Sequence, residues 1–500
     1  MNDFLAAVSM VSDPAAIVAL LGGTLAGIVI GAMPGLSVNM GIALLFPLAF
    51  TVKGMGGIIM LLGIYCGAIY GGSISAILLK TPGTPASAAT TLDGYPMAMK
   101  YKQPGRALGI STTGSMFGGI FSAVCLLIFA PQLAKVALQF SKPEYFALAI
   151  FGVSIITSVS SGSVIKGMIG GLIGLFIATI GIDPMSGAMR FTGTSMYLMG
   201  GVSFIPILIG LFAFSQVLTT IEEDLGPGHQ LHSNVKIDSV LPSWADVKTC
   251  WKTVLRSAGI GTFIGCVPGT GGDISSFICY DQAKRWATDK SKFGDGDPRG
   301  IAAPETGNNA VSGGAFIPVL TMGIPGDGAT AIMLGALMVK GIQPGPLLFI
   351  DKAPYVYAIF IGLMAANIVM GLMGYSLIRL FARVVNVPNT VLVPIIAVLT
   401  FVGTYSYNNS VTDVIVMAVS GFIGYFLNKT EFSIPAIVIG IILGSLAEQN
   451  FTGSLIMSDG SLSIFLTHPI CAAFLLIALV SLISPIFKPM LAGLKKAFIH

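Results

Sequence analysis

Residues 301–345 read IAAPETGNNAVSGGAFIPVLTMGIPGDGATAIMLGALMVKGIQPG, a polar, glycine-rich stretch between long apolar runs. If Pro304 begins a helix, four polar residues at i, i+3, i+4 and i+7 share one face of it: Glu305, Asn308, Asn309 and Ser312. The sequence Gly-Ile-Pro-Gly-Asp-Gly at 323–328 predicts a break in the helix, because proline lacks a donor and glycine favours other backbone states. Inside a membrane, such a polar face and broken backbone need protein or a water-filled cavity beside them. The stretch therefore indicates the binding region of a transporter.

The composition of the whole chain is typical of a membrane protein. Of its 500 residues, 54% are hydrophobic and 10% are charged, and the mean hydropathy is +0.87. Soluble domains contain about 25% charged residues. Many apolar runs approach or exceed the roughly 18–20 residues that cross a bilayer, so we predict an all-α polytopic membrane protein with about 10–14 membrane segments. The 63 glycines let helices pack closely and break.

Charge and cysteine usage exclude several other classes of protein. The net charge of +4 is small and scattered among loops, so no nucleic-acid partner is expected. The six cysteines show no Cys-x-x-Cys spacing, which indicates neither a metal site nor a disulfide framework, and no cofactor is expected. The first residues lack a basic region and do not resemble a cleaved signal peptide.

The second half of the chain repeats motifs of the first half. Gly31-Ala-Met-Pro-Gly matches Gly265-Cys-Val-Pro-Gly, and Lys80-Thr-Pro-Gly-Thr matches Gly323-Ile-Pro-Gly-Asp. These matches and two others lie in the same order at an offset of about 240 residues, which favours internal duplication over chance recurrence of Pro-Gly pairs. Breaks at corresponding places in two repeats are typical of the substrate site of a secondary transporter. We therefore predict two inverted structural repeats with broken helices and re-entrant hairpins.

A polar stretch divides the chain between these repeats. We predict a first transmembrane repeat at residues 1–221, a polar linker at 222–250 and a second transmembrane repeat at 251–500. The basic cluster Lys100, Lys102 and Arg106 places its loop in the cytoplasm by the positive-inside rule. If the repeats are inverted, the matching loop at Lys340 faces outward, and it carries one lysine instead of a cluster.

Several of these motifs together resemble one family of transporters. They are Pro34-Gly-Leu, Asp93-Gly-Tyr-Pro-Met-Ala with the basic stretch that follows it, Pro304-Glu-Thr-Gly-Asn-Asn-Ala and Gly323-Ile-Pro-Gly. This combination resembles the large membrane subunit of the tripartite tricarboxylate transporters, the TctA family, over nearly the whole chain. The resemblance implies a multi-pass permease of the bacterial inner membrane that imports small carboxylates such as citrate, driven by a sodium gradient. It also implies two protein partners, a small membrane subunit (TctB-like) and a periplasmic solute-binding protein (TctC-like).

The residues at the breaks suit such a substrate. A carboxylate needs backbone N–H groups at helix starts, hydroxyls and amides. The candidate substrate-binding residues are Ser37, Asn39, Thr81, Pro82, Gly83, Thr84, Ser87, Thr270, Gly271, Asn308, Asn309, Pro325 and Gly326. A sodium ion needs oxygen ligands, for which Asp327 and Asp273 are candidates. For each break taken alone, a structural kink between two membrane spans explains the sequence as well.

Two other functional classes remain open from the residues. A membrane-embedded enzyme acting on a lipid or small polar substrate needs a nucleophile with a base, or a metal cluster. No histidine accompanies the acidic residues of the polar stretches, and no Gly-x-Ser-x-Gly or His-Glu-x-x-His occurs, so we expect no enzyme. A channel could also use paired broken helices, and saturable, ion-coupled flux would distinguish a carrier from it.

Overall fold

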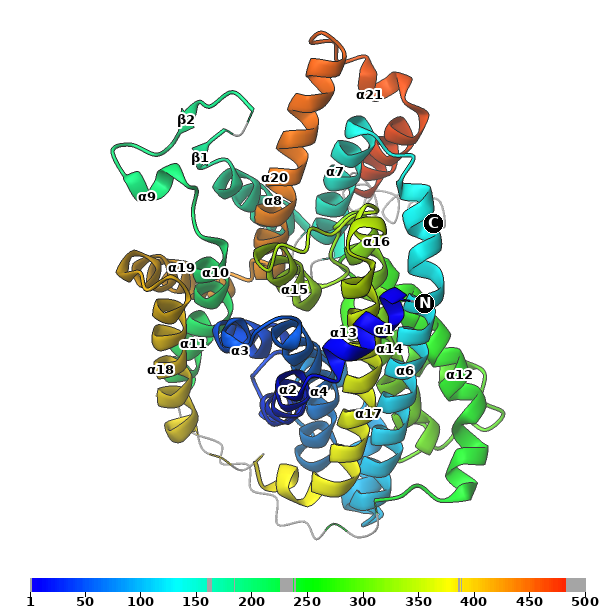
Figure 1. The fold of residues 1–500 in the computed structure, drawn as a ribbon. Coiled ribbons are helices and arrows are strands. Elements are labelled where there is room, and N and C mark those ends of the chain that lie inside the picture. The colour runs from blue at the N-terminus through cyan, green and yellow to red at the C-terminus, as the bar shows by residue number, and fades with distance from the viewer. Residues whose placement is uncertain are drawn as a thin grey trace, which may run out of the picture.

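The computed structural model describes residues 2–159, 164–183, 185–224, 237, 240–384, 387 and 389–482. Most of the described chain is helical (Figure 1). A single small sheet in this part of the chain pairs β1 (Gly181–Ile182) with β2 (Met189–Arg190) in antiparallel register, Gly181 opposite Arg190. The predicted all-α class is confirmed.

The helices of the first half begin with α1 (Asn2–Val11), α2 (Pro14–Ala32), α3 (Val38–Thr51), α4 (Gly56–Leu79), η1 (Pro85–Ser87), α5 (Thr91–Tyr95) and the π-helical η2 (Pro96–Lys100). They continue with α6 (Pro104–Ala137), α7 (Lys142–Val159), α8 (Val164–Ala178), α9 (Met196–Met199), α10 (Phe204–Leu208), the π-helical η3 (Ile209–Phe214) and α11 (Ser215–Asp224). Of the predicted linker at 222–250, residues 225–236 and 238–239 lie outside the described residues.

The second half contains α12 (Trp244–Cys266), α13 (Gly271–Arg285), α14 (Pro298–Met322), α15 (Gly328–Val339), α16 (Leu348–Asp351), α17 (Ala353–Val384), α18 (Asn389–Asn408), α19 (Val411–Lys429), α20 (Ile434–Met457) and α21 (Ile464–Thr467). A further apolar helix, Pro469–Leu482, follows α21. Across both halves, the described residues contain 8 helices long and apolar enough to cross a membrane, and several shorter apolar helices such as α3 and α15. The chain is therefore a multi-pass membrane protein.

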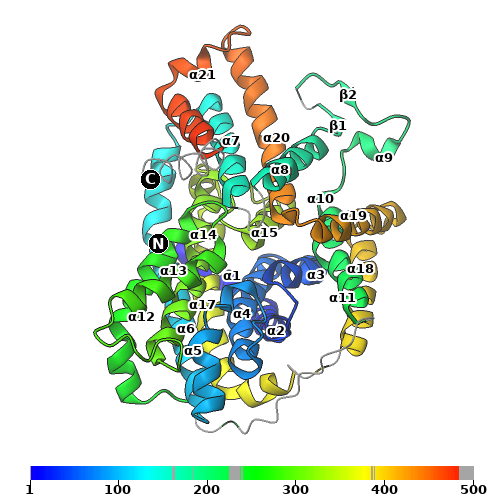
Figure 2. The ribbon, with the colours of Figure 1, turned by 180° about the vertical axis from the view of Figure 1, so that it is seen from behind.

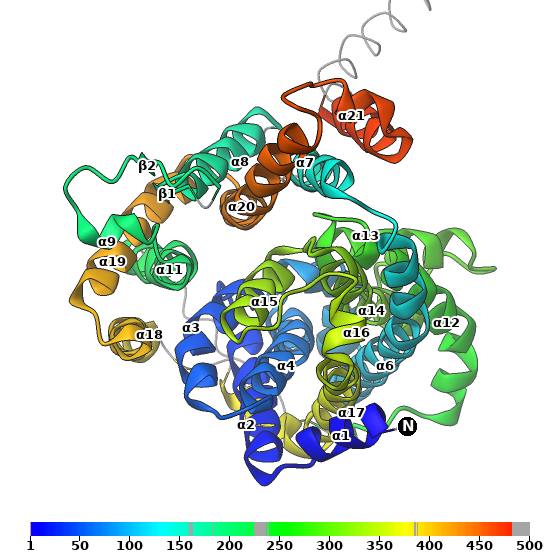
Figure 3. The ribbon, with the colours of Figure 1, turned by 45° about the horizontal axis from the view of Figure 1, so that its top comes forward.

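The helices form a core bundle and an outer arm. The core bundle comprises α1–α6 and α12–α17; its central helices α4 and α14 are buried along almost their whole length. The outer arm comprises α7–α11 and α18–α21, and from the tilted view it curves around one side of the bundle (Figure 3). From behind, α20 and α8 lie above α3 and α4 (Figure 2). The arm contacts the bundle where α20 packs on α15 and where α18 and η3 pack on α3.

Three close backbone contacts recur in the two halves. A Cβ atom added to Gly27 of α2 would lie 2.5 Å from the Ile64 carbonyl oxygen of α4, and one added to Gly261 of α12 would lie 2.2 Å from that of Gly307 in α14. In the same way, Gly31 lies against the carbonyl oxygen of Ala68, and Gly265 lies against that of Val311. Likewise, Gly83 approaches the Gly31 carbonyl and Gly326 approaches the Gly265 carbonyl. Glycine thus lets α2 cross α4 closely in the first half and α12 cross α14 closely in the second. The opposite orientation of the two halves in the membrane stays a prediction.

One predicted boundary is wrong. Pro304 does not begin a helix but lies inside α14, which begins at Pro298 after the N-cap Asp297. The side chain of Asp297 accepts the N–H of Arg299, and Pro298 occupies the first turn, where its missing N–H costs nothing. This stronger start lies upstream of Pro304. The predicted polar face of Glu305, Asn308, Asn309 and Ser312 therefore lies within a longer helix.

Candidate functional site

Helix breaks from both halves border one cavity of about 230 Å³. Its walls come from the starts of α3, α13 and α15, from residues 84–86 and from the start of α20. The lining residues are Ser37, Val38, Asn39, Tyr65, Ile69, Thr84, Pro85, Ala86, Gly269, Thr270, Gly271, Gly272, Asp273, Ile274, Asp327, Gly328, Ala329, Ser433, Pro435 and Ile439. The cavity therefore lies where the core bundle meets the outer arm.

The break after α2 places the start of α3 beside this cavity. The helix α2 ends at Ala32, and the Ser37 side chain accepts the N–H of Met40 at 3.2 Å to cap α3. Asn39, in the first turn of α3, packs against Gly328 at the start of α15; a Cβ on Gly328 would lie 2.6 Å from the Asn39 amide nitrogen. Two helix starts from different halves are thus in direct contact.

The second half contributes two further helix starts. Asp327 caps α15: its Oδ1 accepts the Thr330 N–H at 2.7 Å, and the Thr330 hydroxyl accepts the Asp327 N–H at 2.9 Å. The Thr270 hydroxyl, just before α13, donates to the carbonyl oxygens of Ile264 and Val267 at 2.6 and 2.8 Å. The Gly269 N–H donates to the Gly326 carbonyl at 2.7 Å, so this break is tied to the one that precedes α15.

Each central helix reaches across to a tip segment of the other half. We name residues 80–90 the first tip segment and residues 323–327 the second tip segment. The Tyr65 hydroxyl of α4 donates to Asp327 Oδ2 at 2.8 Å, and the Asn308 amide of α14 donates to the Ala86 carbonyl at 3.0 Å. Tyr65 and Asn308 stand equally far before the left-handed residues that end their helices, Lys80 and Gly323. The pattern is reciprocal and joins the two halves at the cavity.

The structure places the predicted residues in two groups. Those that line the cavity are Ser37, Asn39, Thr84, Thr270, Gly271, Asp273 and Asp327. Those outside the lining are Thr81, Pro82, Gly83, Ser87, Asn308, Asn309, Pro325 and Gly326. The glycines and prolines of the second group shape the breaks, and Gly83 and Gly326 allow the tip segments to approach α2 and α12.

The asparagine pair lies behind the cavity wall. The Asn309 amide donates to the Glu305 carbonyl at 3.0 Å and to Asn308 Oδ1 at 2.7 Å, and both asparagines are buried. The Asn309 Oδ1 atom is buried without a hydrogen-bond partner, as are the hydroxyls of Thr84 and Ser87. Asn308 therefore positions the first tip segment, and Asn309 orients Asn308.

Sequence reasoning missed Tyr65 and the α20 wall. Tyr65 lies in an apolar run that is typical of an ordinary membrane span. Its position relative to the end of its helix nevertheless matches that of Asn308 in the other half. Ser433, Pro435 and Ile439 begin α20 in the outer arm, and nothing local in their sequence indicates that they return to the cavity.

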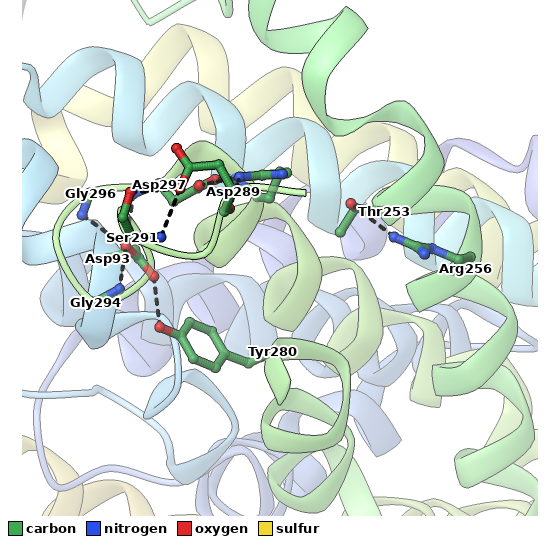
Figure 4. A network of polar contacts seen from close by, with 10 residues as sticks. Asp93, Thr253, Arg256, Tyr280, Asp289, Ser291, Gly294, Gly296 and Asp297 are labelled. Carbon is green, nitrogen blue, oxygen red and sulfur yellow. Dashed lines mark hydrogen bonds and ion pairs between the residues drawn. The ribbon is translucent and has the colours of Figure 1, made fainter. Parts of the chain in front are cut away.

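A separate polar network secures the loop between α13 and α14 (Figure 4). Asp93 Oδ1 accepts the backbone N–H groups of Gly294, Gly296 and Asp297 at 2.8–2.9 Å, and Oδ2 accepts the Tyr280 hydroxyl at 2.9 Å. Burial raises the pKa of Asp93 above its ordinary value, while these hydrogen bonds act in the opposite direction. The motif Asp93-Gly-Tyr-Pro of the first half therefore holds a loop of the second half.

An exposed ion pair lies beside this network. Lys100 Nζ contacts Asp295 Oδ1 at 2.7 Å on the same loop. The hydrogen bond from Lys100 lowers the pKa of Asp295 and raises that of Lys100. Because both side chains are exposed, the pair contributes much less to holding the loop than Asp93 does.

The charges around the cavity suit an anion together with a cation. The starts of α3, α13 and α15 carry the positive end of a helix dipole and unpaired N–H groups. Asp273 and Asp327 face the same cavity, and the charge of Asp327 acts on Asp273. Two carboxylates in one small space favour a bound cation. In the described part of the chain, no cluster of three His, Cys, Asp or Glu residues could hold a metal ion.

Comparisons with known proteins agree over most of the chain. Residues 17–439 match the tripartite tricarboxylate transporter TctA family. An uncharacterized 52.8 kDa protein in the TAR-I ttuC' 3' region of Agrobacterium vitis is 34% identical over 483 residues, 96% of this chain and 94% of that protein. An uncharacterized protein in the TAR-II ttuC' 3' region of the same organism is 33% identical over 223 residues, 45% of this chain and 92% of that protein. No solved structure matches.

Proposed function

Because the chain belongs to the tripartite tricarboxylate transporter TctA family, we propose that it is the large permease subunit of a secondary active transporter that imports small carboxylates, such as citrate, across the bacterial inner membrane. The observation that carries this proposal is the cavity where helix starts from both halves meet. Membership of a transporter family argues for a carrier rather than for the membrane-embedded enzyme considered from the sequence.

The helix starts would bind the carboxylate groups of the substrate. Residues 37–39, 270–272 and 328–329 border the cavity, and their backbone N–H groups, the Ser37 hydroxyl and the Asn39 amide are the candidate donors. Helix N-termini stabilise anions by their dipole and by their unpaired N–H donors. A small polycarboxylate could contact more than one of these starts at once, which fits a site built from both halves.

Asp273 and Asp327 would bind the coupling ion, which we propose to be sodium. The two carboxylates border the same cavity as the helix starts, so the cation would neutralise them and stand beside the anionic substrate. Neither ligand would then bind well without the other, because each screens charges that repel its partner. Coupled binding of this kind is what a symporter requires.

Two protein partners complete the proposed transporter. We propose a small membrane subunit (TctB-like) and a periplasmic solute-binding protein (TctC-like) that delivers the carboxylate. The tripartite organisation of the family supports this part of the proposal.

Reconstitution tests the proposal. Labelled citrate uptake is measured in liposomes that contain this chain and the small membrane subunit, with the binding protein added outside and a sodium gradient imposed. Saturable uptake that needs all three proteins and the gradient is expected. Full-rate uptake by this chain alone, or flux that does not saturate, contradicts the proposal. Liposomes with a Gly326→Ala chain, in which the second tip segment cannot close on α12, serve as the matched control for specific transport.

A further inference from the structure

Glu305 is a carboxylate in the middle of the core bundle that the proposed site does not use. It lies within α14, and its side chain is 0% exposed. Among the described residues, no lysine, arginine or histidine forms an ion pair with it. A buried, unpaired carboxylate is costly in its charged form, so its environment must either hold a cation or favour the neutral acid.

Its direct neighbours are neutral polar groups. The Thr90 hydroxyl donates to Glu305 Oε1 at 2.5 Å, the Ser115 hydroxyl donates to Oε2 at 3.1 Å, and the Asn308 amide lies 3.5 Å from Oε1. The two oxygen–oxygen distances are those of hydrogen bonds from hydroxyls to a carboxyl group. Hydroxyls can donate to a carboxylate or accept from a carboxylic acid by rotating about the C–O bond. These hydroxyls can therefore hydrogen-bond Glu305 in its charged and in its neutral form without a change in the backbone.

No stronger charge controls this cluster from neighbouring helices. None of the titratable side chains on the elements packed against α14 forms a hydrogen bond or ion pair with the Glu305 carboxyl group among the described residues. These side chains are Tyr65, Cys66 and Tyr70 on α4, Asp93 and Tyr95 on α5, Arg106, Cys125 and Lys135 on α6, Asp246, Lys248, Cys250, Lys252, Arg256 and Cys266 on α12, and Asp273, Cys279, Tyr280, Asp281, Lys284 and Arg285 on α13, with Arg299 on α14 itself. The Tyr70 hydroxyl is bonded to Thr112, Asp93 to the loop before α14, and Arg106 to Asp246. Each of these three is thus satisfied by another partner, which leaves the hydroxyl cluster as the immediate environment of Glu305.

The cluster is connected to the cavity by one short segment. Thr90, which bonds Glu305, and Thr84 to Ala86, which line the cavity, all belong to the first tip segment. The Asn308 amide also bridges the two places, since it donates to the Ala86 carbonyl and lies next to Glu305. A ligand in the cavity contacts residues 84–86, and Glu305 bonds Thr90 of the same segment on the side away from the cavity. Movement of this segment on ligand binding therefore changes the surroundings of Glu305.

We propose that Glu305 is a proton-binding site of the transport cycle, which exchanges one proton as the first tip segment moves. Protonation forms one O–H bond from a lone pair of a Glu305 oxygen and a proton delivered from water, and it changes the side-chain charge from −1 to 0. Release breaks the same bond and returns the proton to water. This inference rests on the proposed function as a carrier, and it adds a coupled proton to the cation held by Asp273 and Asp327.

Infrared spectroscopy tests proton binding without any transport. The full-length chain is placed in lipid bilayers, and the C=O stretching band of protonated carboxyl groups is followed as the pH is lowered. A band that grows in the wild type and is lost in Glu305→Gln is expected. The matched control is Asp413→Asn, which changes another carboxylate that is 0% exposed and bonded to Tyr197 and Asn408. The Glu305 band must persist in this variant.

A second variant keeps the test valid if Glu305→Gln does not fold. Ser115→Ala removes one hydrogen bond to Oε2, and the loss should move the Glu305 band to higher frequency. Identical spectra in the wild type, Glu305→Gln and Ser115→Ala overturn the inference.

Transport gives the third readout. With the complete transporter, Glu305→Gln should lose citrate uptake driven by a pH gradient but retain exchange of labelled for unlabelled citrate. Retained gradient-driven uptake overturns the inference. Absence of citrate uptake by the wild type contradicts the proposed function instead, while the infrared result still decides whether Glu305 binds a proton.

Discussion

Replacing Asp93 with alanine should release the loop between α13 and α14. The change removes the acceptor of three backbone N–H groups and of the Tyr280 hydroxyl, all within 2.9 Å. Hydrogen bonds to a charged group contribute about 1.5–3 kcal/mol each and do not add fully. The substitution leaves four donors without their acceptor, at about 1–3 kcal/mol for each buried one, so a total of about 3–5 kcal/mol is expected after incomplete additivity. Gly294 and Gly296 hold left-handed φ angles of 92° and 99°, so the loop has little intrinsic preference for this shape.

Limited proteolysis measures this opening directly. A cost of about 3–5 kcal/mol raises the open fraction of the loop by roughly a hundred- to a few thousandfold. Lys290 and Lys292 are exposed and lie just before the residues that Asp93 holds. Cleavage after them needs the backbone to unfold locally, so its rate follows the open fraction of the loop. Purified protein in lipid bilayers should therefore be cut far faster after Asp93→Ala.

The matched control is Asp295→Ala in the same loop. Asp295 is exposed and pairs with Lys100 at the surface, so its loss should change the cleavage rate little. Equal cleavage of Asp93→Ala and wild type would refute the reasoning, because it would mean that the loop holds its shape without the buried acceptor.

Three further changes test other parts of the structure. Asn308→Ala leaves the buried Ala86 carbonyl without its donor, which costs about 1–3 kcal/mol, and should cut citrate uptake about tenfold with normal membrane insertion; unchanged uptake contradicts this role. Gly326→Ala places a methyl group 2.6 Å from the Gly265 carbonyl and should abolish uptake, whereas Gly259→Ala, with nothing within 4 Å, should not; equal uptake by both excludes the packing argument. Cysteines placed at Lys100 and Lys340 should react with an impermeant reagent from opposite sides of the membrane, and labelling from the same side disproves the inverted repeat.

The helix breaks were predictable because their causes are local. Proline and glycine at 34–35 and 325–326 stop a helix whatever surrounds them, and Ser37 and Asp327 are good caps for the helices that follow. Pro304 does not start a helix, because Asp297 and Pro298 provide a capped start six residues upstream. Local sequence signals alone do not reveal which of two possible starts a helix will use.

The composition of the cavity was predictable only in part. Residues beside the breaks, such as Asn39 and Thr270, line it because helix ends are also the places where polar backbone is exposed. Asn308 proved to lie behind the wall, and Tyr65 proved to be part of it, because hydrogen bonds between the halves decide both positions. The wall from α20 depends on how the outer arm packs against the bundle, which no short stretch of sequence specifies.

The sodium dependence of uptake by the complete transporter tests the central claim most directly, with wild type compared with Asp327→Asn and Asp273→Asn. Asparagine at 327 keeps an oxygen that can accept the Thr330 N–H, so the start of α15 should survive while the charge is lost. We expect each variant to raise the sodium concentration for half-maximal citrate uptake about ten- to hundredfold and to change the half-saturating citrate concentration, at saturating sodium, much less. Unchanged sodium dependence in both variants would contradict the account, because it would place the coupling ion outside the cavity where the two halves meet.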